Sequence, residues 1–176
     1  MNIEALLVPI IRRAVANVFS TMLQVEIAEG ERGIESSTPD TNDGVVSFIG
    51  LTGDWAGTGS LACSPVLACR LCSQMVMSET TSVNEDVLDA IAELTNMIVG
   101  SVKHDLEEHV GPLALSIPTV VFGRNFRTKS AGSSEWVVMR FHWKDDLLVV
   151  KMCLAPRGKK LHAVAHSAAP ACAVDV

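Results

Sequence analysis

The longest hydrophobic pattern in the chain runs from Asp86 to Glu108, in the segment DVLDAIAELTNMIVGSVKHDLEE. At about 100° per residue, its apolar side chains fall within about a third of the circumference, as a core-facing helix requires. The stripe comprises Leu88, Ile91, Ala92, Thr95, Ile98, Val99, Val102 and Leu106. The pattern therefore predicts an amphipathic helix that packs on the core.

A second row of residues lies on another side of this predicted helix. Asp89, Glu93 and Asn96 follow an i, i+4, i+7 spacing, with Gly100 and Lys103 beyond them, so the first three side chains line up over about 10 Å. A solvent-facing side usually mixes lysines and glutamates, whereas this row has two acids, an amide and a glycine. Spacing alone favours an ordinary solvated surface, but the composition is typical of a contact surface.

General acid–base catalysis is one chemistry that the two carboxylates of this row could perform. Asp89 and Glu93, however, are predicted on an outer helix face, with no sign of a pocket that would shift a pKa. A free-standing hydrolase is therefore disfavoured. The row better fits a surface that completes the active site of another protein.

The N-terminal part of the chain predicts a helix, a short strand and a loop. Ile3 to Leu23 has a largely helical pattern, and Pro9 indicates that its first turn begins there, because proline is tolerated near a helix start. Val25 to Ile27 is typical of a short strand. Glu29 to Asp43 is polar and carries turn residues, so we expect a surface loop.

The central part predicts a hairpin followed by a helix. Val45 to Leu51 and Gly59 to Cys63 are typical of strands, and the glycines of TGDWAGT between them favour a hairpin turn. Ser64 and Pro65 then suit the N-cap and first position of a helix that runs to about Met77.

The last part of the predicted domain is made of strands. Extended segments are expected at Leu113 to Phe122, with Pro118 at a strand start or edge, and at Glu135 to Trp143 and Leu147 to Leu154. The element order predicts an α+β fold with helices packed on an antiparallel β-sheet. We expect one domain over residues 1–156 and an Ala-rich, loosely held tail over residues 157–176.

Composition narrows the function classes. A formal net charge of −6 argues against non-specific nucleic-acid binding, which depends on lysine and arginine. The sequence contains no run of 18 uninterrupted apolar residues, so it predicts no membrane span. At the N-terminus an acid precedes the apolar run and the arginines follow it, the reverse of a secretion signal. Five cysteines, an odd number, favour reduced thiols. We therefore expect a cytoplasmic protein.

Other reactive residues favour structural roles. Cys69 and Cys72 form a CxxC in the middle of a predicted helix, where core packing is the simpler interpretation. His162 and His166 have the spacing of metal ligands but no acidic partner nearby, and we expect no metal site and no cofactor. The glycines of TGDWAGTGS lead into a strand, which disfavours a phosphate-binding loop.

The row of Asp89, Glu93 and Asn96 has the form D-x-x-x-E-x-x-N within DAIAELTNMIVGSVK. It resembles the phosphatase signature of the CheC/CheX family of bacterial chemotaxis. The hairpin FIGLTGDWAGTGSLACSP, the following helix with Ala68 and Met75, and LSIPTVVFG are also similar to segments of that family. The resemblance covers residues 3–154. The first helix contains no ExxN, so the pattern resembles the CheX-like branch with a single signature.

This resemblance implies a hydrolase that dephosphorylates the aspartyl phosphate of a CheY-like response regulator. In the family model, Asn96 orients the attacking water and Glu93 pairs with a lysine of the receiver domain. Asp89 would contribute peripheral docking, and Gly100 would keep the helix surface low where the partner approaches. The receiver would carry its own Mg²⁺, and the CheX-like branch implies a homodimer joined through the sheets.

Two other functions stay open at this stage. One alternative is a non-catalytic, CheC-like binding module for a receiver domain or a flagellar switch component, which the intact Glu93 and Asn96 disfavour. A thiol-dependent activity of Cys69 and Cys72 is the more remote alternative.

Overall fold

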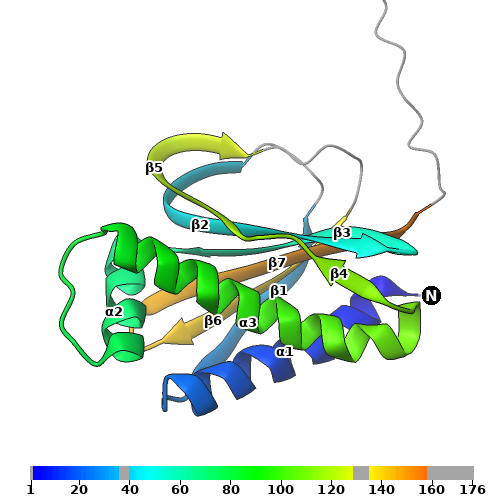
Figure 1. The fold of residues 1–176 in the computed structure, drawn as a ribbon, viewed down its shortest axis with the longest axis horizontal. Coiled ribbons are helices and arrows are strands. Elements are labelled where there is room, and N and C mark those ends of the chain that lie inside the picture. Colours follow the sequence, from blue (N-terminus) through cyan, green and yellow to red (C-terminus); the bar gives the residue numbers. More distant parts are fainter. Residues whose placement is uncertain (1, 36–39, 129–134, 158–176) are drawn as a thin grey trace, which may run out of the picture.

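The computed structural model describes residues 2–35, 40–128 and 135–157. Within these ranges it has three helices on a seven-stranded sheet (Figure 1). The helices are α1 (Ile3–Met22), α2 (Pro65–Val76) and α3 (Glu85–Val110). The strands are β1 (Ala28–Glu35), β2 (Asp40–Gly53), β3 (Trp55–Cys63), β4 (Leu113–Leu115), β5 (Thr119–Thr128), β6 (Trp136–Trp143) and β7 (Asp146–Pro156). The predicted α+β fold is confirmed.

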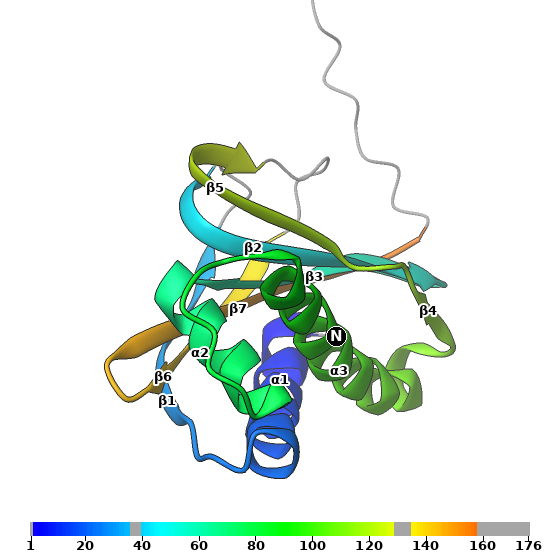
Figure 2. The same cartoon turned by 60° about the vertical axis from the view of Figure 1, so that its left-hand side comes forward.

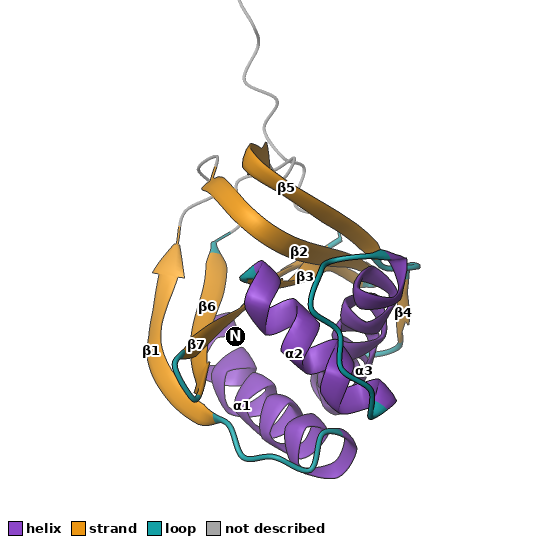
Figure 3. Ribbon diagram, turned by 90° about the vertical axis from the view of Figure 1, so that its left-hand side faces the viewer, coloured by secondary structure: helices purple, strands orange, loops and turns teal. Residues whose placement is uncertain are grey.

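The sheet is antiparallel throughout its described pairs, in the order β1-β6-β7-β3-β2-β4. Both β4 and β5 pair with the same side of β2, β4 beside residues 51–53 and β5 beside residues 40–48. These two short partners therefore lie end to end along one edge of β2. The three helices lie on one side of the sheet, which curves around them (Figure 3).

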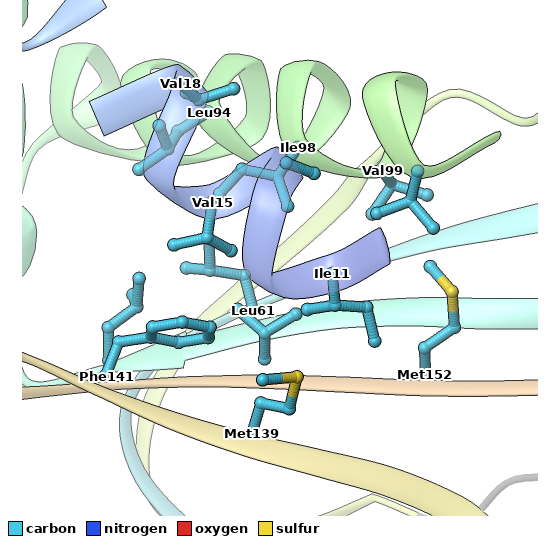
Figure 4. Close-up of a cluster of buried hydrophobic side chains, with 14 of the residues drawn as sticks. Ile11, Val15, Val18, Leu61, Leu94, Ile98, Val99, Met139, Phe141 and Met152 are labelled. Carbon is cyan, nitrogen blue, oxygen red and sulfur yellow. The ribbon is translucent and has the colours of Figure 1, made fainter. Parts of the chain in front are cut away.

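The hydrophobic core lies between the helices and the sheet (Figure 4). Ile11 and Val15 of α1 and Ile98 of α3 extend toward Leu61 and Phe141 on the strands. All five are at most 2% exposed, and burying a side chain of this kind contributes about 1.5–3 kcal/mol to stability. Most of the stripe predicted for α3 is buried, whereas Leu88 and Ala92 are half-buried. The buried side of α3 also includes residues outside the predicted stripe, namely Val87, Ala90, Leu94 and Val110.

The first helix begins earlier than its proline suggests. Asn2 caps α1, because its side chain accepts a hydrogen bond from the Ala5 N–H at 3.2 Å, and Pro9 lies inside the helix. The prediction of a start at Pro9 is wrong. Pro9 and Ala5 are both exposed, so the Ala5 carbonyl that loses its helical donor can be hydrated by water.

Among the described residues, α1 is also long and apolar enough to cross a membrane when it is judged by length and composition alone. Core helices pass the same test. Eight side chains of α1 are buried in this fold, where the helix contacts α3 and β6. In the structure this apolar surface is used for packing, which makes the test weak evidence for a membrane span.

The segment from Glu29 to Asp43 is not the loop that its polar composition predicts. Residues 29–35 belong to β1, β2 begins at Asp40, and residues 36–39 lie outside the described part. Val25 to Ile27 is likewise not a strand. Strand β1 pairs only with β6 among the described strands, and its side chains are mostly exposed. Backbone hydrogen bonds to β6 therefore determine an edge strand that has little hydrophobic pattern.

The other predicted elements are confirmed with changed bounds, and the extended segment predicted at Leu113 to Phe122 forms two strands, β4 and β5, separated by residues 116–118. The hairpin of β2 and β3 turns more tightly than predicted, since Thr52 already pairs with Ala56. The Ser64 hydroxyl caps α2 by accepting a hydrogen bond from the Leu67 N–H at 3.1 Å. Strand β5 begins directly after Pro118, and β6 and β7 form the expected hairpin. Residues 158–176 of the predicted tail lie outside the described residues.

Candidate functional site

Helix α3 carries the predicted row, and its two ends are defined by local hydrogen bonds. The Asn84 side chain accepts the Val87 N–H at 3.0 Å, which satisfies one of the free donors at the helix start. At the other end Gly111 adopts a φ of 80°, and its N–H donates to the Glu107 carbonyl at 3.1 Å. These caps define a helix of 26 residues, in which the row occupies the middle.

Contacts on three sides hold α3 in place. The Arg13 guanidinium of α1 donates to the Asp105 carboxylate at 2.6 Å, and the Cys72 thiol of α2 lies 3.7 Å from the Asp86 carbonyl. The helices α1 and α2 both pack along α3 (Figure 2). The sheet covers a third side. The exposed row is therefore carried by an element with little freedom to rotate.

The C-terminal turn of α3 is joined to the edge strand β4. The Lys103 ammonium lies 2.8 Å from the Glu107 carboxylate, which also accepts the backbone N–H of Leu113 at 2.8 Å. The Leu113 hydrogen bond first, and then Lys103, hold the pKa of Glu107 below its ordinary value. Because Leu113 is the first residue of β4, this carboxylate couples the helix end to the sheet edge.

The structure places the four candidate residues together on the uncovered side of α3. Asp89 and Glu93 are exposed, and Asn96 and Gly100 are half-buried. Among the described residues, no hydrogen bond or ion pair engages the side chains of Asp89, Glu93 or Asn96. A carboxamide and two carboxylates are thus presented outward with their hydrogen-bonding groups available.

Asn96 and Glu93 face slightly different directions. At about 100° per residue, Asn96 lies about 60° around the helix from Glu93, on the side toward Val99, which packs on the sheet. This agrees with the half-buried state of Asn96 and the exposed state of Glu93. Asn96 is therefore the member of the row next to the sheet edge, and Glu93 projects further into solvent.

The surface beside Gly100 is open. A Cβ added at Gly100 would have its nearest neighbour at 3.9 Å, the Leu115 Cδ1. Packing within this chain therefore does not require a glycine at this position. The missing side chain leaves a low point on α3, one turn after Asn96.

The cysteines take the structural role that their position in the helix predicts. Cys69 and Cys72 are 6% and 0% exposed, and burial raises the pKa of Cys69. Burial likewise raises the pKa of Cys63 to about 12. Low pKa and access to solvent are the marks of a reactive thiol, so these buried thiols fit core packing.

Metal ligation finds little support in the described part of the chain, where no group of three His, Cys, Asp or Glu side chains converges. His104 and His109 are exposed near the C-terminal end of α3, where a positive charge would interact favourably with the helix dipole. His162 and His166 lie outside the described residues. The glycines of the TGDWAGT segment form the β2–β3 hairpin.

Ile117 is a surface residue that the hydrophobic pattern does not single out. It lies between β4 and β5 and is 88% exposed. Its neighbours in LSIPTVVFG predict an extended segment, and periodicity alone would assign its side chain to either face. Pro118 follows Ile117 directly. A proline within an extended segment is the signal in the sequence that the strand is interrupted here.

Comparison with known proteins identifies the family. Residues 45–142, which contain α3, match the family model "Chemotaxis phosphatase CheX". The chain is 32% identical over 127 residues to the CheY-P phosphatase CheX of Thermotoga maritima, a match that covers 70% of this chain and 81% of the relative.

Solved structures have the same fold. The chemotaxis protein CheX from Vibrio vulnificus is 26% identical, with a TM-score of 0.72, over 85% of this chain and 99% of that one. The CheX of a CheX-CheY-BeF₃-Mg²⁺ complex from Borrelia burgdorferi is 21% identical, with a TM-score of 0.73, over 84% and 97%. The family match, the Thermotoga relative and the fold agree, and this chain belongs to the chemotaxis phosphatase CheX family.

Proposed function

We propose that this protein dephosphorylates the aspartyl phosphate of a CheY-like receiver domain, with Asn96 and Glu93 as its catalytic residues. The observation that carries the proposal is their arrangement on α3. They are adjacent, outward-facing and free of partners among the described residues, on a helix held by α1, α2 and the sheet. Family membership and the activity named for the Thermotoga maritima relative support the same function.

Asn96 positions the attacking water. An aspartyl phosphate is a reactive acyl phosphate, so orientation of a water in line with the scissile bond is the main contribution needed. The water oxygen bonds to phosphorus while the bond from phosphorus to the aspartate oxygen breaks, which releases phosphate and a free carboxylate. A neutral amide suits this task because it both donates and accepts hydrogen bonds and does not repel the phosphoryl group.

Glu93 fixes the direction of approach. It lies three residues before Asn96, on the same side of α3 and further into solvent. A carboxylate here can pair with a lysine of the receiver as Asn96 enters the receiver's site, and such a charge-assisted contact has a defined geometry. Glu93 thereby determines where the amide of Asn96 stops relative to the phosphoryl group.

Asp89 and Gly100 complete the docking surface. Asp89 lies one helical turn before Glu93 and contributes a peripheral negative charge, while Gly100 leaves a low point one turn after Asn96. The partner can therefore approach Asn96 from the Gly100 side without a steric barrier on α3.

The divalent metal in this proposal is bound to the receiver. The complex from Borrelia burgdorferi combines CheX with CheY, BeF₃ and Mg²⁺, which supports a role of this ion at the shared site. The phosphatase then supplies an amide and a carboxylate, and needs neither a nucleophile nor a metal of its own. A receiver substrate also favours a cytoplasmic location for this chain.

We also propose a homodimer and a folded unit that ends near residue 156. The outer edge of β1 and that of the β4–β5 segment have no strand partner among the described residues. Unpaired edges are the usual route to sheet extension between protomers. Light scattering of the purified protein would test the dimer, and a chain truncated after residue 156 that fails to fold would refute the boundary.

The decisive experiment measures the decay of a phosphorylated CheY-like receiver in the presence of Mg²⁺. Phosphorylated receivers from the source organism are incubated with wild type, with Asn96→Ala or with no added protein, and the three decay rates are compared. Acceleration by wild type alone supports the phosphatase and its central residue. Binding to a receiver without acceleration of its decay would instead favour a non-catalytic binding module.

A further inference from the structure

Arg157, the last described residue, lies beside the C-terminal end of α3. Strand β7 ends at Pro156, and the backbone N–H of Arg157 donates to the Asp54 carbonyl at 2.7 Å. The Asp54 carboxylate lies 4.0 Å from the point where a side chain at Gly111 would begin, and Gly111 is the C-cap of α3. The end of β7 and the C-terminal end of α3 lie on the same side of the molecule in two views (Figures 1 and 2). Residues 158–176 therefore start next to the helix that carries the candidate row.

The length of this segment is sufficient to cover the row. At a helical rise of about 1.5 Å per residue, Asn96 lies about 22 Å and Glu93 about 27 Å along α3 from Gly111. Residues 158–176 can span about 60 Å when fully extended, and residues 158–166 alone can span about 30 Å. The first half of the segment is therefore long enough to reach Glu93.

Residues 158–166 are basic. Their sequence, GKKLHAVAH, contains two lysines and two histidines and no acidic residue. The exposed Arg157 directly precedes them. In a protein with a formal net charge of −6, such a stretch is attracted to an acidic surface that lies within its reach.

Helix α3 offers this acidic surface. It contains seven acidic residues and one lysine, and that lysine, Lys103, is paired with Glu107. Asp89 and Glu93 are exposed, and no hydrogen bond or ion pair engages their side chains in the described part of the chain. Gly100, between the end of the helix and the row, leaves open space where a backbone can lie against α3. The uncovered face of α3 therefore matches the basic stretch in charge and in distance.

We propose that residues 158–176 bind back along the exposed row of α3 and compete with the receiver domain for Glu93 and Asn96. This inference rests on the proposed function and adds its regulation, because the receiver must displace the segment before Asn96 can enter the receiver's site. Exposed ion pairs are weak individually. The segment, however, is joined to the chain beside α3, which gives it an effective concentration far above that of a separate protein.

The first test measures the contact in the full chain without any phosphatase assay. The four cysteines that the structure describes are buried, so a nitroxide label can be directed to the segment by Ala165→Cys combined with Cys172→Ser. Cys172→Ser alone is the labelling control and should take up no nitroxide. The readout is the line width of side-chain amide signals in NMR spectra, with Asn96 on α3 compared with the exposed Asn17 on α1.

We expect the label to broaden the Asn96 signal and to leave the Asn17 signal unchanged. Lys159→Gln together with Lys160→Gln should reduce this broadening, because the attraction to the carboxylates of α3 is weakened. An Asn96 signal that is the same with and without the label would overturn the inference. Equal broadening with and without the two lysines would also overturn it, since mere proximity would then explain the effect.

The second test compares KM for the phosphorylated receiver in the full-length Lys159→Gln/Lys160→Gln variant and in wild type. Lys144→Glu is the matched control, because it changes the net charge by the same amount at an exposed position between β6 and β7. Thermal unfolding checks that both variants fold. We expect the double variant to lower KM about three-fold, as the loss of two exposed ion pairs implies, with kcat at saturation unchanged.

Lys144→Glu should retain the KM of wild type. An unchanged KM in the double variant would refute the competition, and a higher KM would show that the two lysines recruit the receiver instead. If wild type accelerates the decay of no receiver, the proposed function and the competition both fail. The nitroxide experiment still decides in that case whether the segment binds α3, so the two failures are distinguishable.

Discussion

Val99 of α3 packs directly on the bare α-carbon of Gly59 in β3. A Cβ added at Gly59 would lie only 2.7 Å from the Val99 Cγ2 and 3.2 Å from the Met152 Cε. The helix is thus seated on the sheet more closely than a side chain would allow. Val99 lies three residues after Asn96, so the height at which α3 sits also determines where Asn96 projects.

Gly59→Ala should lower the free energy of unfolding by about 1–3 kcal/mol, the usual cost of overpacking a core. Gly100→Ala is the matched control, because the added methyl group has space there. Replacing a glycine within a helix by alanine should raise the free energy of unfolding by about 0.5–1 kcal/mol. Urea denaturation of both variants gives the two values. Equal effects of the two substitutions would contradict the close packing of α3 at Gly59.

Asn96→Ala should abolish the accelerated decay of the phosphorylated receiver while the fold is retained. Loss of a positioned group can cost about 100-fold in rate, and Asn96 is outside the buried stripe of α3. The rates of receiver decay and the thermal unfolding curve are the measurements. Asn17→Ala is the control, since Asn17 is an exposed asparagine on a different helix, α1. Full activity in Asn96→Ala would refute the assignment.

Glu93→Gln should mainly raise KM, by about ten-fold or more, because a hydrogen-bonded charge pair with the receiver is lost. The salt dependence of KM should become weaker at the same time. Steady-state kinetics at several ionic strengths measure both effects. Glu108→Gln tests specificity and should leave KM unchanged, because Glu108 is exposed but lies about four helical turns further along α3. A Glu93→Gln variant with the salt dependence of wild type would exclude the proposed pair.

Cys69→Ala and Cys72→Ala should keep the specific activity of the folded protein. Both thiols are buried and belong to the core beneath α2, so their removal creates small cavities, at a cost in stability of about 1 kcal/mol each. Activity per folded molecule, corrected by circular dichroism, is the measurement. Loss of activity in a fully folded variant would revive the thiol-dependent alternative.

Acid should weaken the attachment of α3 to β4. The pKa of Glu107 is lowered in the folded state by the Leu113 N–H and by Lys103, so its contribution to stability is present above its ordinary pKa of 4.5 and is lost as pH falls through the folded pKa. The free energy of unfolding of wild type should therefore fall more steeply below about pH 4.5 than that of Glu107→Gln. Denaturant titrations from pH 6 to about pH 3 measure the two slopes, and identical slopes would contradict the prediction.

The main features of α3 could be predicted from the sequence. Its apolar stripe recurs with the helical period, and the row from Asp89 to Gly100 is defined by the same spacing, so helix and outward row both follow from local order along the chain. The hairpin of β2 and β3 and the Ser64 cap of α2 likewise depend on neighbouring residues. The membership of the CheX family that the resemblance implies is confirmed by the comparisons.

Features that depend on distant residues required the tertiary structure. Strand β1 lacks a hydrophobic pattern because its stability comes from backbone bonds to β6, more than 100 residues later. Pro9 does not mark a helix start, because Asn2 supplies the cap and the lost bond faces solvent. The end-to-end placement of β4 and β5 along one edge of β2 arises from pairing between residues that are far apart in the sequence. Periodicity in a sequence encodes which side of an element avoids water. Which elements become neighbours is decided by pairing and packing across the whole chain.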